Sequence, residues 1–232
     1  MKKASVTAII LSAGVSHRMA GDVSKQLMKI SGVSVVRRTA LAFASASTIT
    51  NIIVVARGEE ISEVTSEVLD IPKLSLVIAG GECRAESARL GFLAAKETSD
   101  LIAIHDGARC LVTPEIIDRV VLQAIECGAA SAGAAVTDTV KRTDSEASII
   151  GTVDRDTLYF AATPQVFSTA LYERALNEYK GDLLQLTDDN MLVEALDVRI
   201  RLVDCGKENI KITTAEDVNY AEFLIEKREK NA

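Results

Sequence analysis

Residues 6–26 read VTAIILSAGVSHRMAGDVSKQ. The first part, 6–12, is mostly apolar without strict alternation, which predicts a strand buried on both faces. Small residues follow it directly, and then come the cations Arg18 and Lys25. Flexible backbone and positive charge at the end of a core strand indicate a site for an anion, although ordinary turns have a similar composition.

Short apolar runs recur downstream, and segments with helical spacing separate them. The runs 51–56, 74–78 and 100–105 predict further strands buried on both faces. The helical segments are 33–46, 59–69, 84–96 and 113–128, the last with Thr113 as N-cap, Pro114 in the first turn and Gly128 after its end. This alternation predicts an α/β fold with a mostly parallel sheet and helices on both faces.

The alternation changes after Val136. The runs 137–142 and 147–155 are typical of strands and flank the polar turn TDSE, which predicts a hairpin over 137–155 that projects from the main sheet. A simple surface excursion explains the pattern equally well. The rest of the chain predicts, in order, helices at 168–179 and 188–196, a strand at 198–204 and a helix at 214–230.

Composition narrows the class of protein. The chain has 232 residues, 48% of them hydrophobic, and a formal net charge of −7. This acidic balance argues against a broad nucleic-acid or anionic-membrane surface. No apolar run approaches the roughly 20 residues that a membrane span needs. The cysteines lack CxxC spacing, and we expect free thiols in a reducing cytoplasm.

Ligands of open parallel sheets bind at the carboxyl ends of the strands, and several predicted strand ends carry suitable groups. Glycines, cations and Asp106 together predict a phosphate site, with Asp106 as a ligand for a hard divalent ion. Neither G-x-G-x-x-G nor a P-loop is present. His17 is interpreted as a surface residue and His105 as a satisfied histidine. The segments that follow the strands are Ser12–Gly14 with Arg18 and Lys25, Gly80–Glu82 with Arg84 and Ser87, His105–Arg109, and 209–214 with Lys211.

These segments resemble a known family. LSAGVSHRM with Lys25, then GGECRAES, HDGAR, DTVKR, TVDR, TPQVF, LTDD and NIKITT, occur in the order seen in 2-C-methyl-D-erythritol 4-phosphate cytidylyltransferases of the non-mevalonate isoprenoid pathway. The resemblance covers about 8–222. It implies a single Rossmann-like nucleotidyltransferase domain over 1–232 that uses CTP and Mg²⁺, and a cytoplasmic homodimer whose β-hairpin arm, 137–155, reaches the partner's active site.

The resemblance also assigns roles. Arg18, Lys25 and Lys211 correspond to the catalytic cations on the phosphates, and Asp106 to the metal ligand, which also contacts both substrates. Arg84 supports the nucleotide loop. The CTP-binding positions are Ser12, Ala13, Gly14, Gly81, Glu82, Arg84, Ser87 and Asp106. The positions for the polyol phosphate are Asp106, Arg109, Thr163 and Thr187, with Thr139 and Arg155 on the arm.

Some positions depart from the usual family pattern. Glu82 replaces an aspartate, which moves the ribose contact by one methylene, and His17 replaces an arginine beside Arg18. The charged groups central to the chemistry are retained, so we expect an active enzyme. The remaining departures are Ser12 for alanine, Ser16 for glycine, Gly107 for alanine, Cys110 for proline and Asp189 for glutamate.

The expected reaction needs no general base, because the attacking substrate phosphate is already ionised at neutral pH. Catalysis then consists of positioning and charge neutralisation. Three alternatives stay open at this point. Ribitol 5-phosphate cytidylyltransferases share most of these motifs. A non-catalytic nucleotide-binding protein is disfavoured by the retained cations, and a dinucleotide-dependent oxidoreductase by the missing G-x-G-x-x-G.

Overall fold

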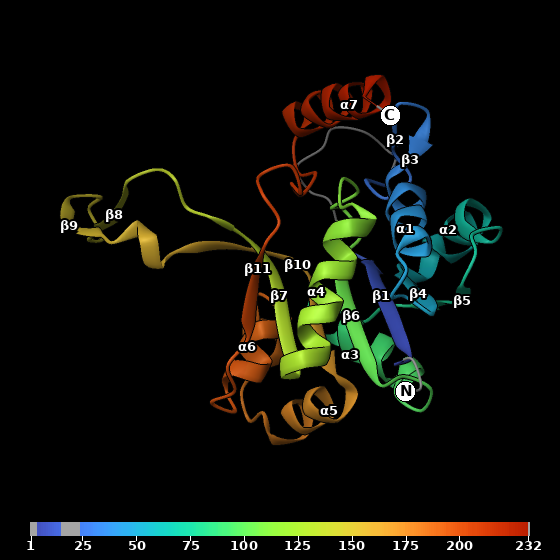
Figure 1. Cartoon of the computed structure of the whole chain (residues 1–232), viewed down its shortest axis with the longest axis horizontal. Coiled ribbons are helices and arrows are strands. Elements are labelled where there is room, and N and C mark those ends of the chain that lie inside the picture. The colour runs from blue at the N-terminus through green and yellow to red at the C-terminus, as the bar shows by residue number, and fades with distance from the viewer. Residues whose placement is uncertain (1–3, 15–23, 232) are drawn as a thin grey trace.

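A seven-stranded sheet forms the centre of the protein, with the strand order β11-β7-β10-β6-β1-β4-β5 (Figure 1). The computed structural model describes residues 4–14 and 24–231. Neighbouring strands are parallel, except that β10 runs antiparallel to β6 and β7. The predicted mostly parallel sheet is therefore confirmed. The strands are β1 (Val6–Ser12), β4 (Asn51–Ala56), β5 (Leu74–Ala79), β6 (Leu101–Asp106), β7 (Ala129–Ala135), β10 (Tyr159–Ser168) and β11 (Arg201–Asp204).

Helices cover both faces of the sheet, as the alternating pattern predicts. Successive side chains of β1 point to opposite faces, so Ile10 packs in one core cluster and Ile9 in the other. The cluster of Ile10 includes residues of α1 (Val35–Ser45), α2 (Ile61–Val68) and α4 (Pro114–Cys127). The cluster of Ile9 includes residues of α3 (Arg84–Ala95), α5 (Thr169–Glu178) and α6 (Asp189–Glu194).

A third cluster lies near the carboxyl edge of the sheet. It joins α7 (Ala215–Lys230) to the short hairpin of β2 (Lys29–Ile30) and β3 (Val33–Ser34), at the top of Figure 1. A capping box between Thr214 and Asp217 starts α7. The loop that carries Lys211 leads directly into this cap, so the packing of α7 fixes where that loop lies.

The predicted hairpin over 137–155 is confirmed. Strands β8 (Val140–Thr143) and β9 (Ile149–Val153) form a separate two-stranded sheet that projects from the body (Figure 1). Ile149 and Ile150 are 66% and 56% exposed. Short 3₁₀ turns complete the structure at η1 (Gly58–Glu60), η2 (Arg155–Thr157) and η3 (Leu183–Gln185).

The structure corrects some details. The run 74–78 was expected to be buried on both faces, but β5 is an edge strand and Leu76 is 46% exposed. Strands β7 and β10 were not predicted, because AASAGAA lacks bulky residues and β10 contains Thr163-Pro164. In the described part of the chain, no helix combines the length and apolar character that crossing a membrane requires.

Candidate active site

Loops at the carboxyl edge of the sheet enclose a cavity of about 580 Å³. The parallel register brings the loop ends together, since Leu11 of β1 lies opposite Asp106 of β6. Most of the predicted CTP-binding residues line the cavity, with two of the three predicted cations. Its lining consists of Leu11, Ala13, Gly14, Lys25, Gln26, Gly81, Glu82, Cys83, Arg84, Ser87, Asp106, Ala108, Lys211 and Thr213.

The glycine loop after β5 packs tightly against the end of β1. A Cβ atom on Gly80 would lie 2.5 Å from Ala13 Cβ and 2.7 Å from Ser87 Oγ, so this approach requires glycine. The Ser87 hydroxyl accepts a hydrogen bond from Gly81 N–H at 3.1 Å and donates to Cys83 O at 3.0 Å. The loop thus delivers the N-terminus of α3 to the cavity, where backbone N–H groups and the helix dipole favour an anion.

Asp106 is surrounded by cations. Its Oδ1 accepts a hydrogen bond from Arg84 Nε at 3.0 Å, and its Oδ2 accepts one from Lys211 Nζ at 3.0 Å. Arg109 Nε lies 3.7 Å from the same Oδ2. Burial alone would raise the pKa of Asp106, but the charges of Arg84 and Lys211 outweigh it and hold that pKa well below the ordinary value. The carboxylate is therefore ionised whenever the protein is folded near neutral pH.

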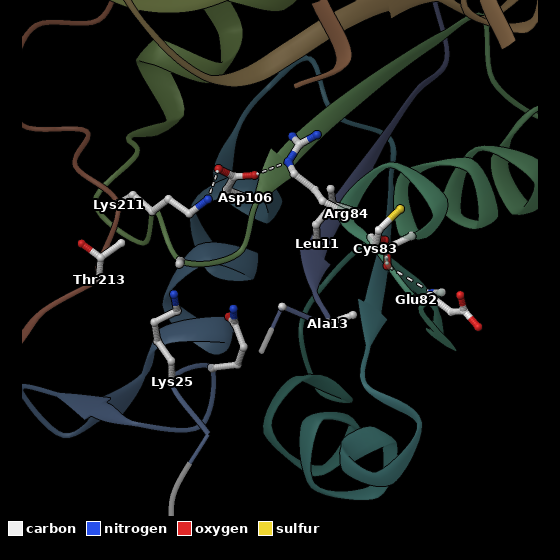
Figure 2. Close-up of a pocket in the computed structure, with 14 residues that line it drawn as sticks. Leu11, Ala13, Lys25, Glu82, Cys83, Arg84, Asp106, Lys211 and Thr213 are labelled. Carbon is white, nitrogen blue, oxygen red and sulfur yellow. Dashed lines mark hydrogen bonds and ion pairs between the residues drawn. The ribbon is translucent and has the colours of Figure 1, made fainter. Parts of the chain in front are cut away.

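Lysine side chains reach the space in front of Asp106 from different loops. Figure 2 shows Lys25 pointing into the cavity from one side and Lys211 extending toward Asp106 from another. The structure thus brings Lys25 and Lys211 together, as predicted. Arg18, His17 and Ser16 lie outside the described residues. The carboxylate of Glu82 points away from Asp106, at the far rim of the cavity (Figure 2).

Other predicted residues lie around this cavity rather than in its wall. Arg109 lines a neighbouring cavity of about 460 Å³, which Lys211 also borders. Ser12 is completely buried beside Gly107. Thr163 is 3% exposed, and its Oγ1 accepts a hydrogen bond from Asp106 N–H at 3.0 Å. Thr163 therefore supports the backbone of Asp106 from inside the protein.

The remaining predicted positions are exposed. Thr187 donates a hydrogen bond to Met191 Sδ at 3.1 Å, at the start of α6. Thr139 and Arg155 lie at the two ends of the arm, outside its paired strands β8 and β9. Arg155 Nη1 donates to Thr137 O at 2.6 Å, which joins the two ends of the arm. Thr139, Arg155 and Thr187 do not line either of the two cavities described above.

His105 is a satisfied buried histidine, as the sequence interpretation favoured. Its ring packs 4.9 Å from Phe43, and burial lowers its pKa to about 3. The carbonyl Arg109 O can only accept a hydrogen bond, so in the neutral ring Nδ1 carries no proton and accepts from the Thr163 hydroxyl at 3.0 Å. The ring proton is thereby assigned to Nε2, which donates to Arg109 O at 3.2 Å. Both ring nitrogens are occupied, so His105 orients the strand end and is not available as a base.

The predicted metal ligand is a single carboxylate. Among residues 4–14 and 24–231, no three His, Cys, Asp or Glu side chains are grouped so as to hold a metal ion. Mg²⁺ often takes one or two protein carboxylates and completes its shell with phosphates and water. Asp106 beside a cavity of this size fits that mode. An ion there would compete with Lys211 for Oδ2.

Comparison with known proteins identifies the family. Residues 6–227 match the family model of 2-C-methyl-D-erythritol 4-phosphate cytidylyltransferase. The chain is 37% identical to the protein of that name from Caldanaerobacter subterraneus, over 96% of this chain and 100% of the relative. It is 33% identical to the one from Alkaliphilus oremlandii, over 95% and 94% of the chains. The chain belongs to this family.

Solved structures of relatives agree with this assignment. The structure of 4-diphosphocytidyl-2C-methyl-D-erythritol synthase from Anaerococcus prevotii superposes with a TM-score of 0.86 at 25% identity. It covers 97% of this chain and 100% of that structure. The match therefore spans nearly the whole length of both chains.

Some residues that line the larger cavity were not predicted. Gln26, Cys83, Ala108 and Thr213 line the cavity. Each directly follows or lies within two residues of a predicted position, and this proximity is the signal that could have found them. Asp189, noted in the sequence only as a departure from the family pattern, forms an ion pair with Arg84. No local sequence signal indicates that pairing.

Proposed function

We propose that this protein is a nucleotidyltransferase that transfers CMP from CTP to 2-C-methyl-D-erythritol 4-phosphate. The products are 4-diphosphocytidyl-2-C-methyl-D-erythritol and pyrophosphate, in isoprenoid precursor biosynthesis. The observation that carries this proposal is the cation-lined cavity at the carboxyl edge of the sheet, in a chain of this family. The corresponding domain is 1–232, and a cytoplasmic location suits such a biosynthetic step.

The larger cavity is the proposed CTP site. Its volume of about 580 Å³ lies within the usual range for small-molecule sites. The tight backbone around Ala13, Gly14 and Gly81 offers fixed N–H and C=O groups to the base and ribose, and the α3 N-terminus suits the phosphates. Lys25 and, on sequence grounds, Arg18 hold the triphosphate. Glu82 and Ser87 complete the proposed nucleotide contacts.

The neighbouring cavity is the proposed site of the polyol phosphate. Arg109 lines it, and Lys211 borders both cavities, so Lys211 is suited to contact the phosphates of both substrates. The substrate phosphate is an anion that attacks the α-phosphorus of another anion, and pyrophosphate leaves. Positive charge from Lys25 and Lys211 lowers the repulsion between them, which is the main barrier to such a step. No side chain needs to take a proton.

Mg²⁺ is the proposed cofactor, held on the protein by Asp106. When bound, such an ion would neutralise part of the negative charge on the phosphates. Arg84 on Oδ1 keeps the carboxylate ionised, and Lys211 exchanges Oδ2 for phosphate oxygens when substrates enter.

The arm, 137–155, is proposed to form a homodimer contact that brings Thr139 and Arg155 to the polyol phosphate of the partner. Its strand edges and the side chains of Ile149 and Ile150 are exposed, which supports the proposal that another chain packs against them. A twofold arrangement would cover both arms in the same way. Thr187 is proposed as a further contact of this substrate, while Thr163 would act from behind Asp106 through its hydrogen bond to the Asp106 N–H.

The proposal is tested by pyrophosphate release from CTP and Mg²⁺ with 2-C-methyl-D-erythritol 4-phosphate or ribitol 5-phosphate as acceptor. We expect release with the methylerythritol phosphate and much slower release when ATP replaces CTP at limiting concentration. Faster turnover of ribitol 5-phosphate would reassign the acceptor. If neither acceptor supports the release of pyrophosphate, the proposed activity is wrong.

A further inference from the structure

A chain of partly buried and buried hydrogen bonds runs from Asp106 away from the cavity. Arg84 Nε donates to Asp106 Oδ1 at 3.0 Å, while its Nη1 donates to Asp189 Oδ2 at 2.6 Å. The hydroxyl of Tyr172 donates to the other oxygen of Asp189, also at 2.6 Å. Asp189 and Tyr172 are 3% and 1% exposed. In Figure 2 the guanidinium of Arg84 extends past Asp106 and away from Lys25 and Ala13.

The far end of this chain is held rigidly. The ring of Tyr172, on α5, packs against Phe92 and Phe167, with centroids 5.1 and 5.6 Å away. Asp189 begins α6, and its N–H donates to Gln165 Oε1 at 2.9 Å. The phenol and the carboxylate therefore occupy fixed positions, and Arg84 is stretched between them and the strand end.

The geometry at Arg84 is unusual for an arginine–carboxylate pair. Guanidinium groups commonly grip one carboxylate with paired donors. Here Nε faces Asp106 and Nη1 faces Asp189, while Nη2 is buried without a hydrogen-bond partner among the described residues. Sharing the guanidinium between two carboxylates leaves Asp106 Oδ2 outside its reach. That oxygen is the one that Lys211 contacts.

We propose that Asp189 and Tyr172 are positioning residues, which hold Arg84 so that it takes one oxygen of Asp106 and leaves the other for Lys211 and ligands. Without them, Arg84 turns its paired donors onto Asp106 and occupies both oxygens. Burial and the charge of Asp189 raise the pKa of Tyr172 well above its ordinary value, so the phenol stays a hydrogen-bond donor at working pH. The kinetic part of this inference rests on the proposed function.

The test removes a single hydroxyl with Tyr172→Phe, which keeps the ring packing. The first readout is the ¹⁵N-detected Nε–H resonance of Arg84, assigned with Arg84→Lys, because its shift and exchange rate report the Nε hydrogen bond directly. The second is steady-state kinetics with CTP and 2-C-methyl-D-erythritol 4-phosphate. The matched control is Thr7→Val, which breaks the buried 2.6 Å contact between Thr7 and Ser99 at the opposite end of the sheet.

In Tyr172→Phe we expect the Arg84 Nε–H resonance to shift, because the guanidinium turns relative to Asp106. We also expect kcat to fall about tenfold while KM for CTP changes by less than about twofold, since the defect lies in alignment at the reacting centre. Thr7→Val should leave the resonance in place and kcat within about twofold of wild type. Asp189→Asn, which removes the charge that competes for Arg84, should shift the resonance further and lower kcat more.

The inference is overturned if the resonance is unchanged in both Tyr172→Phe and Asp189→Asn, or if kcat falls no more than in Thr7→Val. If Tyr172→Phe does not fold, Asp189→Asn carries the same test. The NMR readout needs no substrate. An inactive wild type would therefore contradict the proposed function while the resonance still decides whether the chain of hydrogen bonds positions Arg84.

Discussion

The body and the arm of this protein are built in opposite ways. In the body, side chains from distant parts of the sequence meet, as when Arg84 pairs with Asp106 and Asp189. In the arm, β8 and β9 pair only with each other, and the contacts are local, such as Lys141 Nζ to Thr152 Oγ1 at 2.7 Å. The helices and strands of the body pack against one another within the chain. The arm exposes the apolar side chains of Ile149 and Ile150, which the proposed partner chain would cover.

The sharpest test of the body is Lys25→Ala. Lys25 is partly exposed at the cavity, so its truncation leaves no hole in a core. We expect kcat/KM to fall by about 10²–10³, the usual effect of losing one stabilising group at a developing charge. The melting temperature should change little. Pyrophosphate release and thermal unfolding measure the two effects.

The control is Lys96→Ala, which removes a surface lysine paired with Glu173 at 2.8 Å, remote from the cavity. It should keep the wild-type rate. A Lys25→Ala protein that lost activity only in proportion to lost folded material would show that Lys25 has no role in the reaction.

The corresponding test of the arm is Arg155→Lys. A lysine keeps the charge but loses the paired donors that suit a phosphate. We expect KM for the polyol phosphate to rise by about tenfold, with little effect on the KM for CTP. A rise confined to CTP would contradict the assignment of Arg155 to the acceptor.

Mixing the Arg155→Ala protein with the Lys25→Ala protein tests whether the arm of one chain completes the cavity of another. If arm and cavity come from different chains, each mixed dimer contains one site with both residues intact. Random mixing then recovers about a quarter of wild-type activity, because half of the dimers are mixed and half of their sites are whole. Confirmed mixed dimers with no activity above the parents would show that the arm does not complete a partner's site.

For the body, the sequence predicted the helices and strands better than the contacts between their side chains. The bounds of β1, β4 and α4 follow from apolar runs and caps. Strand β7 was missed because its alanines and glycine become a strand only by pairing with β10 and β11. The motifs predicted most of the residues that line the larger cavity, but not Gln26, Cys83, Ala108 or Thr213. They could not show that Arg84 is shared with Asp189, since that pair is separated by 105 residues.

Ser12 and Gly107, which both depart from the family pattern, pack against each other. A Cβ atom on Gly107 would lie 2.4 Å from Ser12 Oγ and 2.9 Å from Leu11 O. We expect Gly107→Ala to destabilise the protein by about 1–3 kcal/mol through overpacking. Adding Ser12→Ala should recover part of this loss, because Ser12 Oγ has no hydrogen-bond partner among the described residues. Urea unfolding of the four proteins measures the coupling.

A coupling free energy of about 1 kcal/mol is expected for this contacting pair. Additive effects of the two substitutions would mean that Ser12 does not limit the space at residue 107. Either result bears on the body alone, and the oligomeric state should stay the same in all four proteins.

The smallest expected effects are on the free energy of unfolding, when either of two carboxylates that accept hydrogen bonds from loops is replaced. Asp118, in the body, accepts hydrogen bonds from the backbone and hydroxyl groups of Ser47 and Thr48. Asp144, in the arm, accepts from the N–H groups of Glu146 and Ser148 at 3.0 and 2.9 Å. Burial alone would raise the pKa of Asp118, but these hydrogen bonds outweigh it and lower that pKa.

Because the folded-state pKa of Asp118 is lowered, its contribution is present above the unfolded-state value of about 3.9 and is lost as pH falls through the folded-state value. We expect Asp118→Asn to lower the free energy of unfolding by about 1–2 kcal/mol at neutral pH, and by less below about pH 4. Asp144→Asn should change it by less than about 0.5 kcal/mol, since the arm contributes little to the core. Urea unfolding at several pH values compares the two variants. An equal loss in both would mean that arm and body unfold as one cooperative unit, and the contrast between a self-contained body and a locally held arm would fail.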